Sequence, residues 1–217
     1  MARSGLVTSW DFSAPGRGER ALVMAVVAGL PAQAVLDRAV DRAVADGADL
    51  VDLGSARAEY VTAVRRRHPE LPIAVAVSGD EAGASGADLV YAAGDTDVRL
   101  IAPVAAAMGA GVICAPEAAA SIIAQGRRPS GVLVTPATVT DPADAGRATE
   151  LVSTGWPVLL TLAADDVAGE IAATAVAAMA GVRVFRTRRV KQVRRTVDMV
   201  ASIAGTRPPA RARRALA

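Results

Sequence analysis

The sequence repeatedly places a glycine, often within a Gly-Ala-Asp segment, directly before a short apolar run. Residues 45–54 show the pattern in full, because Gly47 can end a helix in the left-handed conformation and residues 50–53 form an apolar run too short for a helix. The pattern returns before Leu89, and looser forms begin at four later glycines. Eight strands are therefore predicted, at residues 22–27, 50–53, 73–77, 89–92, 112–115, 132–135, 158–162 and 182–186.

Helical periodicity fills most of the segments between these strands. Helices are predicted at residues 32–45, 56–68, 98–108, 143–154, 167–179 and 191–203, with a short Ala-rich helix that ends near Gly126. The segment SGDEAGASG after the third strand is too short for a full helix. Eight such units predict an α/β fold, a compact (β/α)8 TIM barrel with a shortened or missing helix after strand 3. A doubly wound open sheet is the alternative, but no Gly-x-Gly-x-x-Gly follows the first strand.

Length and composition indicate one domain. The chain has 217 residues, 52% of them hydrophobic and 3% aromatic, so we expect one core built from aliphatic side chains. Residues 1–20 are predicted to be an N-terminal lead-in, residues 21–205 the single barrel domain, and residues 206–217 a basic, disordered tail. Cys114 is the only cysteine, and no signal peptide or membrane span is evident. These features favour a cytoplasmic protein with no membrane contact.

The charge is unevenly distributed. The net charge is +2, yet the residues from Arg183 onward hold eleven basic side chains and one acidic one. Such a split indicates an anion-binding end or a basic tail, and the alternative is a solvated last helix followed by a disordered terminus. Nucleic acid is not an expected partner, because no aromatic residues are interleaved with the basic ones.

The carboxyl ends of the strands, where barrels of this kind carry their chemistry, are nearly bare of polar groups. The exception is the carboxyl end of strand 8, where three arginines lie close together in the sequence. Arg186, Arg188 and Arg189 form a candidate anion site. Arg186 and Arg188 share a face by strand alternation, and two guanidinium groups could bind a phosphate or carboxylate. The alternative is that these arginines cap carbonyl groups at the barrel mouth or pair with Asp165 and Asp166.

The order of several segments is similar to that of dihydropteroate synthase, the pterin-binding barrel of folate synthesis. The resemblance covers about residues 21–204 and rests on the segments LVMAVVAGLP, ADGADLVDLGS, LPIAVAVS, GADLVY, GVLVTP, GWPVLLTL and VRVFRTRRV. It implies a TIM barrel whose relatives join a dihydropterin pyrophosphate to p-aminobenzoate. The predicted helices at residues 167–179 and 194–203 carry small and aliphatic residues with few charges on one face, which favours subunit contact. Members of the resembled family are dimeric, and we expect a homodimer or a hetero-oligomer with a related barrel.

The same resemblance aligns several catalytic and binding residues of the family with residues of this chain that lack the required side-chain groups. The substituted positions are Ala28, for the asparagine that binds the diphosphate and its metal; Ala76, for the pterin-binding aspartate; Thr135, for the aspartate of an Asp-Pro-Gly; and Asp165, for a lysine. The Asn-Asp pair of strand 4 falls at Tyr91 and Ala92. In the Arg-x-His motif of strand 8, Arg186 is retained and Arg188 replaces the histidine.

Loss of these groups predicts loss of the reaction. Each missing hydrogen bond should cost about 1–3 kcal/mol in a buried site, so pterin recognition should be abolished. We therefore expect no catalytic residue, no metal and no cofactor, and a pseudoenzyme related to folate biosynthesis that serves as a non-catalytic partner or structural subunit. Any remaining activity would be that of a dihydropteroate synthase-like transferase. The alternative is an enzyme or sensor that binds a phosphorylated small molecule through Arg186 and Arg188.

Overall fold

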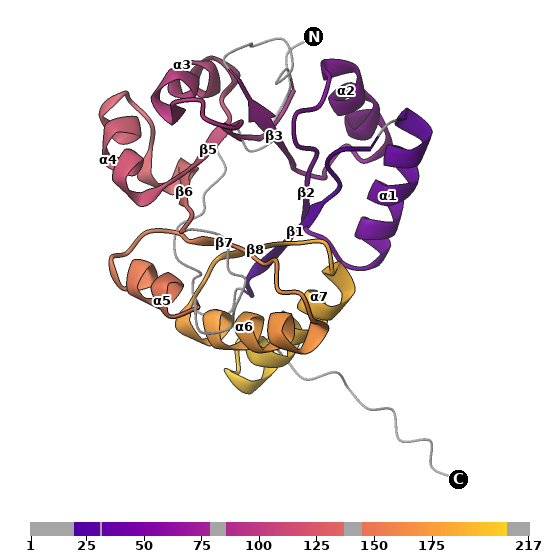
Figure 1. The fold of residues 1–217 in the computed structure, drawn as a ribbon, viewed down its shortest axis with the longest axis vertical. Coiled ribbons are helices and arrows are strands. Elements are labelled where there is room, and N and C mark those ends of the chain that lie inside the picture. Colours follow the sequence, from indigo (N-terminus) through magenta and orange to yellow (C-terminus); the bar gives the residue numbers. More distant parts are fainter. Residues whose placement is uncertain (1–19, 31, 79–85, 137–144, 208–217) are drawn as a thin grey trace.

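The computed structural model describes residues 20–30, 32–78, 86–136 and 145–207, and eight strands surrounded by helices make up this part of the chain (Figure 1). The strands are β1 (Leu22–Val26), β2 (Leu50–Asp52), β3 (Ile73–Val77), β4 (Leu89–Ala92), β5 (Gly111–Cys114), β6 (Val132–Val134), β7 (Leu159–Thr161) and β8 (Val184–Thr187). The helices are α1 (Gln33–Ala45), α2 (Ala58–Arg67), α3 (Val98–Met108), α4 (Pro116–Ala124), α5 (Ala145–Ser153), α6 (Val167–Ala180) and α7 (Val190–Ile203).

The strands form one parallel sheet that closes on itself. Their order is β6-β5-β4-β3-β2-β1-β8-β7, and the two outer strands meet through a parallel bridge between Val134 and Val158. The backbone N–H of Val134 also donates to the carbonyl of Pro157 over 2.9 Å. The predicted (β/α)8 barrel is confirmed, and the doubly wound alternative is wrong because the edge strands pair instead of remaining open.

The core has an inner and an outer layer. One buried residue from each strand points into the barrel, and these residues are Met24, Leu50, Ala74, Leu89, Ile113, Leu133, Leu159 and Val184. The outer layer lies between the sheet and the helices, and Phe185 and Ile101 are among its fully buried members. The two layers follow from strand alternation, because successive side chains point to opposite faces of the sheet.

Glycine permits the tight connections that the sequence pattern predicted. Gly47 follows α1 with φ +96°, so the helix ends in the left-handed conformation expected of this residue. Gly54 follows β2 with φ +63°, and a Cβ atom placed there would lie 2.7 Å from the Cβ of Ala28. Gly54 therefore allows the ends of β1 and β2 to approach closely at the mouth of the barrel.

Some of the predicted segments fall outside the described residues. These include most of the lead-in, residues 79–85 of the shortened connection after β3, and residues 208–217 of the predicted tail. The first two residues of that tail, Thr206 and Arg207, are described, and their backbone N–H groups both donate to the carbonyl of Ala201. Among the described residues, no helix combines the length and apolar character needed to cross a membrane.

Candidate functional site

The mouth of the barrel is lined by the residues that lie two positions beyond the inner core layer. Because side chains alternate along a strand, these residues also point toward the barrel axis. They include Val26, Asp52, Ala76, Tyr91, Thr135, Thr161 and Arg186. A fully apolar layer is thus followed at the mouth by a layer that contains a carboxylate, a phenol and a guanidinium.

Asp52, Tyr91 and Arg186 form one cluster, here called the mouth triad. The Tyr91 hydroxyl donates to Asp52 Oδ1 over 2.8 Å, and Arg186 Nε donates to Asp52 Oδ2 over the same distance. Arg186 Nη2 also donates to Oδ2, and the Gly54 backbone N–H donates to Oδ1. Asp52 has 0% of its surface exposed, so the carboxylate is fully buried and all four of these contacts satisfy it.

The electrostatics of the mouth triad keep the phenol neutral. Burial, and then the charge of Asp52, raise the pKa of the Tyr91 hydroxyl well above its ordinary value. Burial disfavours the charged form of Arg186, but the charges and hydrogen bonds of Asp52 and Tyr91 together outweigh this effect and raise the pKa of Arg186. At neutral pH Tyr91 therefore remains a hydrogen-bond donor, and Arg186 remains a cation.

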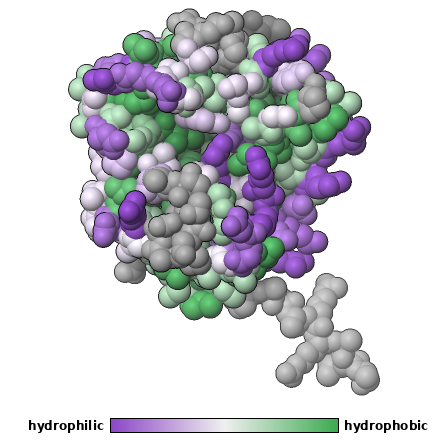
Figure 2. Space-filling model, viewed as in Figure 1, coloured by the Kyte–Doolittle hydropathy of each residue, from purple (hydrophilic) through white to green (hydrophobic). Residues whose placement is uncertain are grey.

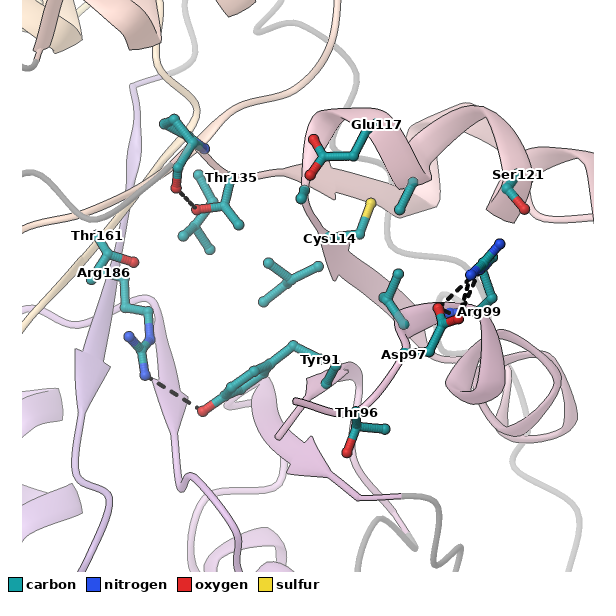
Figure 3. A pocket seen from close by; sticks show the side chains of 17 residues that line it. Tyr91, Thr96, Asp97, Arg99, Cys114, Glu117, Ser121, Thr135, Thr161 and Arg186 are labelled. Carbon is teal, nitrogen blue, oxygen red and sulfur yellow. Dashed lines mark hydrogen bonds and ion pairs between the residues drawn. The ribbon is translucent and has the colours of Figure 1, made fainter. Parts of the chain in front are cut away.

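A cavity of about 690 Å³ opens at the ends of β4 to β7, and Tyr91 and Arg186 border it (Figure 3). Its wall also holds Cys114, Glu117 and Thr135. Cys114 is buried, and burial, with a smaller contribution from Glu117, raises its pKa to about 12. The Cys114 thiol is therefore protonated at neutral pH.

A second cavity, of about 520 Å³, lies beside β1, β7 and β8 and is lined by all three arginines of the candidate anion site. Two of the three already neutralise internal carboxylates, since Arg186 pairs with Asp52 and Arg189 pairs with Glu170. Arg188 is exposed and forms no ion pair with any residue that the structure describes. The arginines are therefore brought together as predicted, but the charge available to an outside anion comes from Arg188.

Arg189 and Glu170 attach α6 to the end of β8. Glu170 is 3% exposed, and it accepts hydrogen bonds from Thr187 Oγ1 and Arg189 Nη1. Arg189 also donates to the backbone carbonyls of Ala164 and Asp165, at 2.7 and 2.9 Å. The predicted alternative of capped carbonyls thus describes Arg189, while the Asp165 and Asp166 side chains form no described pair with these arginines.

The four positions predicted to be substituted provide few functional groups at the mouth. Ala28 borders the second cavity, Ala76 is the neighbour of Tyr91 in the sheet, and Asp165 is exposed. Thr135 borders the first cavity, where its hydroxyl donates to the carbonyl of Pro136. These residues do not fit a metal: Ala28 has no side-chain donor, and no three His, Cys, Asp or Glu side chains gather within the described ranges.

Relatives of known classification match almost the whole chain. A Mycobacterium tuberculosis protein named inactive dihydropteroate synthase 2 is 34% identical, and the match covers 94% of this chain and 89% of the relative. The chain belongs to the dihydropteroate synthase family. A Mycobacterium leprae protein of the same name is 32% identical over 94% of this chain and 97% of the relative. No protein-family model matches the sequence.

Solved structures of the dihydropteroate synthase family share the fold. The Mycobacterium tuberculosis protein Rv1207 has a TM-score of 0.76 and 34% identity, with 91% of this chain and 97% of that chain covered. A Yersinia pestis dihydropteroate synthase, solved with a pterin–sulfa conjugate, has a TM-score of 0.74 and 18% identity over 89% and 99% of the two chains. The 34% match to the tuberculosis relative runs over 283 positions, more than this chain's 217 residues, so that relative has segments that are missing here.

The chain is thus a degenerate family member. The mouth triad was not predicted from the sequence. The predicted site contains neither Asp52 nor Glu170, and it includes Tyr91 only as a substituted position. One feature of the sequence indicates such a cluster, namely the single carboxylate in the apolar run Leu-Val-Asp-Leu. A carboxylate buried in such a run requires a partner. Nothing in the spacing of the sequence identifies that partner.

Proposed function

We propose that the protein is a non-catalytic dihydropteroate synthase-like barrel that acts as a subunit, pairing with a second copy or with a related barrel through the outer face of α6. The proposal places it alongside folate biosynthesis, in the cytoplasm, without a catalytic step of its own. Its support comes from two features. The mouth is predicted to lack most of the family's catalytic and binding groups, with Arg186 as the retained exception, and one helix on the outside of the barrel exposes an apolar face.

The apolar face of α6 is the observation that carries the subunit role. Val167, Ile171, Val176 and Met179 are 43%, 36%, 54% and 73% exposed. The only acidic residue of the helix, Glu170, is buried, so no charged side chain lies on the exposed side. Hydrophobic surface reaches the lower edge of the molecule, where α6 and α7 lie (Figures 1 and 2). A continuous apolar helix face on a barrel exterior is typical of a subunit interface.

The assembly prediction is tested by placing charge on this face. We expect the Val176→Glu, Met179→Glu double variant to be a folded monomer by light scattering, while the unaltered protein elutes as a dimer or with a related barrel. Leu100→Glu is the matched control, because Leu100 is 64% exposed on α3, across the barrel from α6. An unaltered protein that is monomeric at all concentrations, with no co-purifying barrel, would contradict the proposed role.

The loss of catalysis is tested directly. Purified protein supplied with dihydropterin pyrophosphate and p-aminobenzoate should form no dihydropteroate, because Ala28, Ala76, Thr135 and Asp165 cannot supply the missing groups. The Yersinia pestis enzyme is the positive control in the same coupled assay. Turnover within tenfold of the usual enzyme range of about 1–10³ s⁻¹ would refute the prediction. Calorimetric titration with the pterin substrate should likewise show no saturable heat.

A second candidate function is binding of a phosphorylated small molecule. It is favoured by the guanidinium of Arg188, which borders the 520 Å³ cavity and has no ion-pair partner among the described residues. At ten times its dissociation constant, phosphate should stabilise the protein by about 1.4 kcal/mol and raise Tm by roughly 3–6 °C. Arg188→Met should remove this shift, and higher salt should weaken it.

Arg195→Met is the control for the anion site, because Arg195 is another exposed arginine without a described partner. The Arg188 variant is preferred to Arg186→Met, which would leave Asp52 without its cation. If phosphate raises the Tm of the unaltered protein and of both variants equally, the anion site does not exist.

A further inference from the structure

The buried carboxylate of Glu170 fixes the first turn of α6 to the end of β8. Glu170 is 3% exposed, and it is the only charged residue of α6. Its two oxygens accept hydrogen bonds from Thr187 Oγ1 and Arg189 Nη1, and the backbone N–H of Arg189 donates to Thr187 Oγ1 over 2.8 Å. The only ion pair that α6 forms with other described residues is therefore the one between Glu170 and Arg189.

Arg189 also positions the segment that leads into α6. Its Nη1 donates to the carbonyl of Ala164 over 2.7 Å, and its Nη2 donates to the carbonyl of Asp165 over 2.9 Å. One guanidinium group thus holds both the connection between β7 and α6 and the first turn of the helix. Any anion that competes for the donors of Arg189 would therefore loosen the start of α6.

The Glu170–Arg189 pair borders the same 520 Å³ cavity as Arg188. Arg188 is exposed and has no ion-pair partner among the described residues, so an anion that enters the cavity is attracted to it. The anion would then lie in one cavity with the carboxylate of Glu170 and would repel it. Its oxygens would also compete with Glu170 for the donors of Arg189. Both effects weaken the Glu170–Arg189 pair.

The opposite side of the same turn belongs to the apolar face of α6. Val167 and Ile171 are 43% and 36% exposed on the outside of the barrel, three residues before Glu170 and one residue after it (Figure 1). Association through this face requires the two side chains to be held in place. If the turn is loosened, ordering it becomes an added cost of association, so subunit contact weakens.

We propose that the Glu170–Arg189 pair couples the 520 Å³ cavity to the α6 face, so that phosphate binding and subunit contact oppose each other. This inference rests on the proposed function and deepens it, because it assigns a phosphate-bearing ligand as the regulator of the same interface. Coupling between two binding equilibria is reciprocal, so subunit contact weakens phosphate binding by the same factor.

The coupling is measured in both directions. Saturating inorganic phosphate should raise the dissociation constant of the unaltered assembly, determined by analytical ultracentrifugation, at least about fivefold. Sodium chloride at the same ionic strength should change it less than about twofold, because the effect requires a bound anion and not only screening. In calorimetry, phosphate should bind the monomeric Val176→Glu, Met179→Glu variant at least about fivefold more tightly than the assembled protein.

Two variants should lose the response to phosphate at opposite ends of its range. Glu170→Gln keeps the shape and an acceptor oxygen but removes the charge, so its subunit contact should already be weak without phosphate and should not weaken further. Arg188→Met removes the attraction for the anion, so its subunit contact should stay strong with or without phosphate. Glu70→Gln is the control, because Glu70 is exposed in the turn after α2, and it should respond as the unaltered protein does.

Three results would each overturn the coupling: an assembly that phosphate does not weaken, equal phosphate affinity of monomeric and assembled protein, or a Glu170→Gln variant that still responds to phosphate. The last result is expected if Glu170 has only a structural role. All three leave the subunit role intact. A protein that is monomeric at all concentrations without phosphate refutes the subunit role, and the coupling with it. If Glu170→Gln does not fold, the unaltered protein and Arg188→Met still decide.

Discussion

Replacing Asp52 with alanine should lower the free energy of unfolding by about 3–5 kcal/mol, measured by chemical denaturation. Asp52 is fully buried, so the substitution leaves the charge of Arg186 without its partner in a partly buried site. The Tyr91 hydroxyl and the Gly54 backbone N–H also lose their acceptor. For a buried ion pair of this kind, removing one member lowers the free energy of unfolding by more than the intact pair contributes to it.

The double variant Asp52→Leu, Arg186→Met separates the cost of leaving Arg186 unpaired from the net contribution of the ion pair to stability. Because apolar residues of similar volume replace the whole pair, we expect it to recover a large part of the stability that Asp52→Ala loses. A double variant as unstable as the single one would mean that the contacts of Tyr91 and Gly54, rather than the orphaned guanidinium, account for the loss. Unchanged stability of Asp52→Ala would contradict the buried ion pair itself.

The elements of the barrel could be predicted from sequence because their signals are local. Strand β3 and helix α3 have the predicted bounds, since apolar runs, glycines and prolines mark their ends within a few residues. Strand β8 begins at Val184, whereas the prediction began it at residue 182. The N–H of Val182 donates to the carbonyl of Ala177, so this apolar residue takes part in ending α6 before the strand begins.

The mouth triad could not be predicted in the same way, because its members are far apart in the sequence. Asp52 and Arg186 are separated by 134 positions, and no local pattern links them. Their proximity depends on barrel closure and on the register of the strands, which together decide which inward-facing residues share a layer. Sequence reasoning placed Arg186 at the mouth correctly, but without its partner it overstated the positive charge available there.

The second large effect is expected at the opposite end of the barrel, where Asp49→Ala should lower the free energy of unfolding by about 2–4 kcal/mol. Asp49 accepts hydrogen bonds from Arg20 at 3.1 Å, from Arg194 at 2.5 Å and from the backbone N–H of Val23 at 2.8 Å. The Arg194 side chain is 8% exposed, so its charge would lose a partner in a poorly hydrated site.

This network attaches the segment before β1 to α7, the last helix of the barrel. Asp198 on α7 pairs with Arg20 before β1, and also with Arg207 just beyond α7. Asp49→Asn removes the charge but keeps an oxygen that can accept the hydrogen bond from the backbone N–H of Val23. Its free energy of unfolding should therefore fall less than that of Asp49→Ala. Glu59→Ala is the control, because its pair with Arg57 is 63% and 77% exposed and should contribute less than about 1 kcal/mol. If Asp49→Ala costs no more than this control, the network does not stabilise the closed barrel.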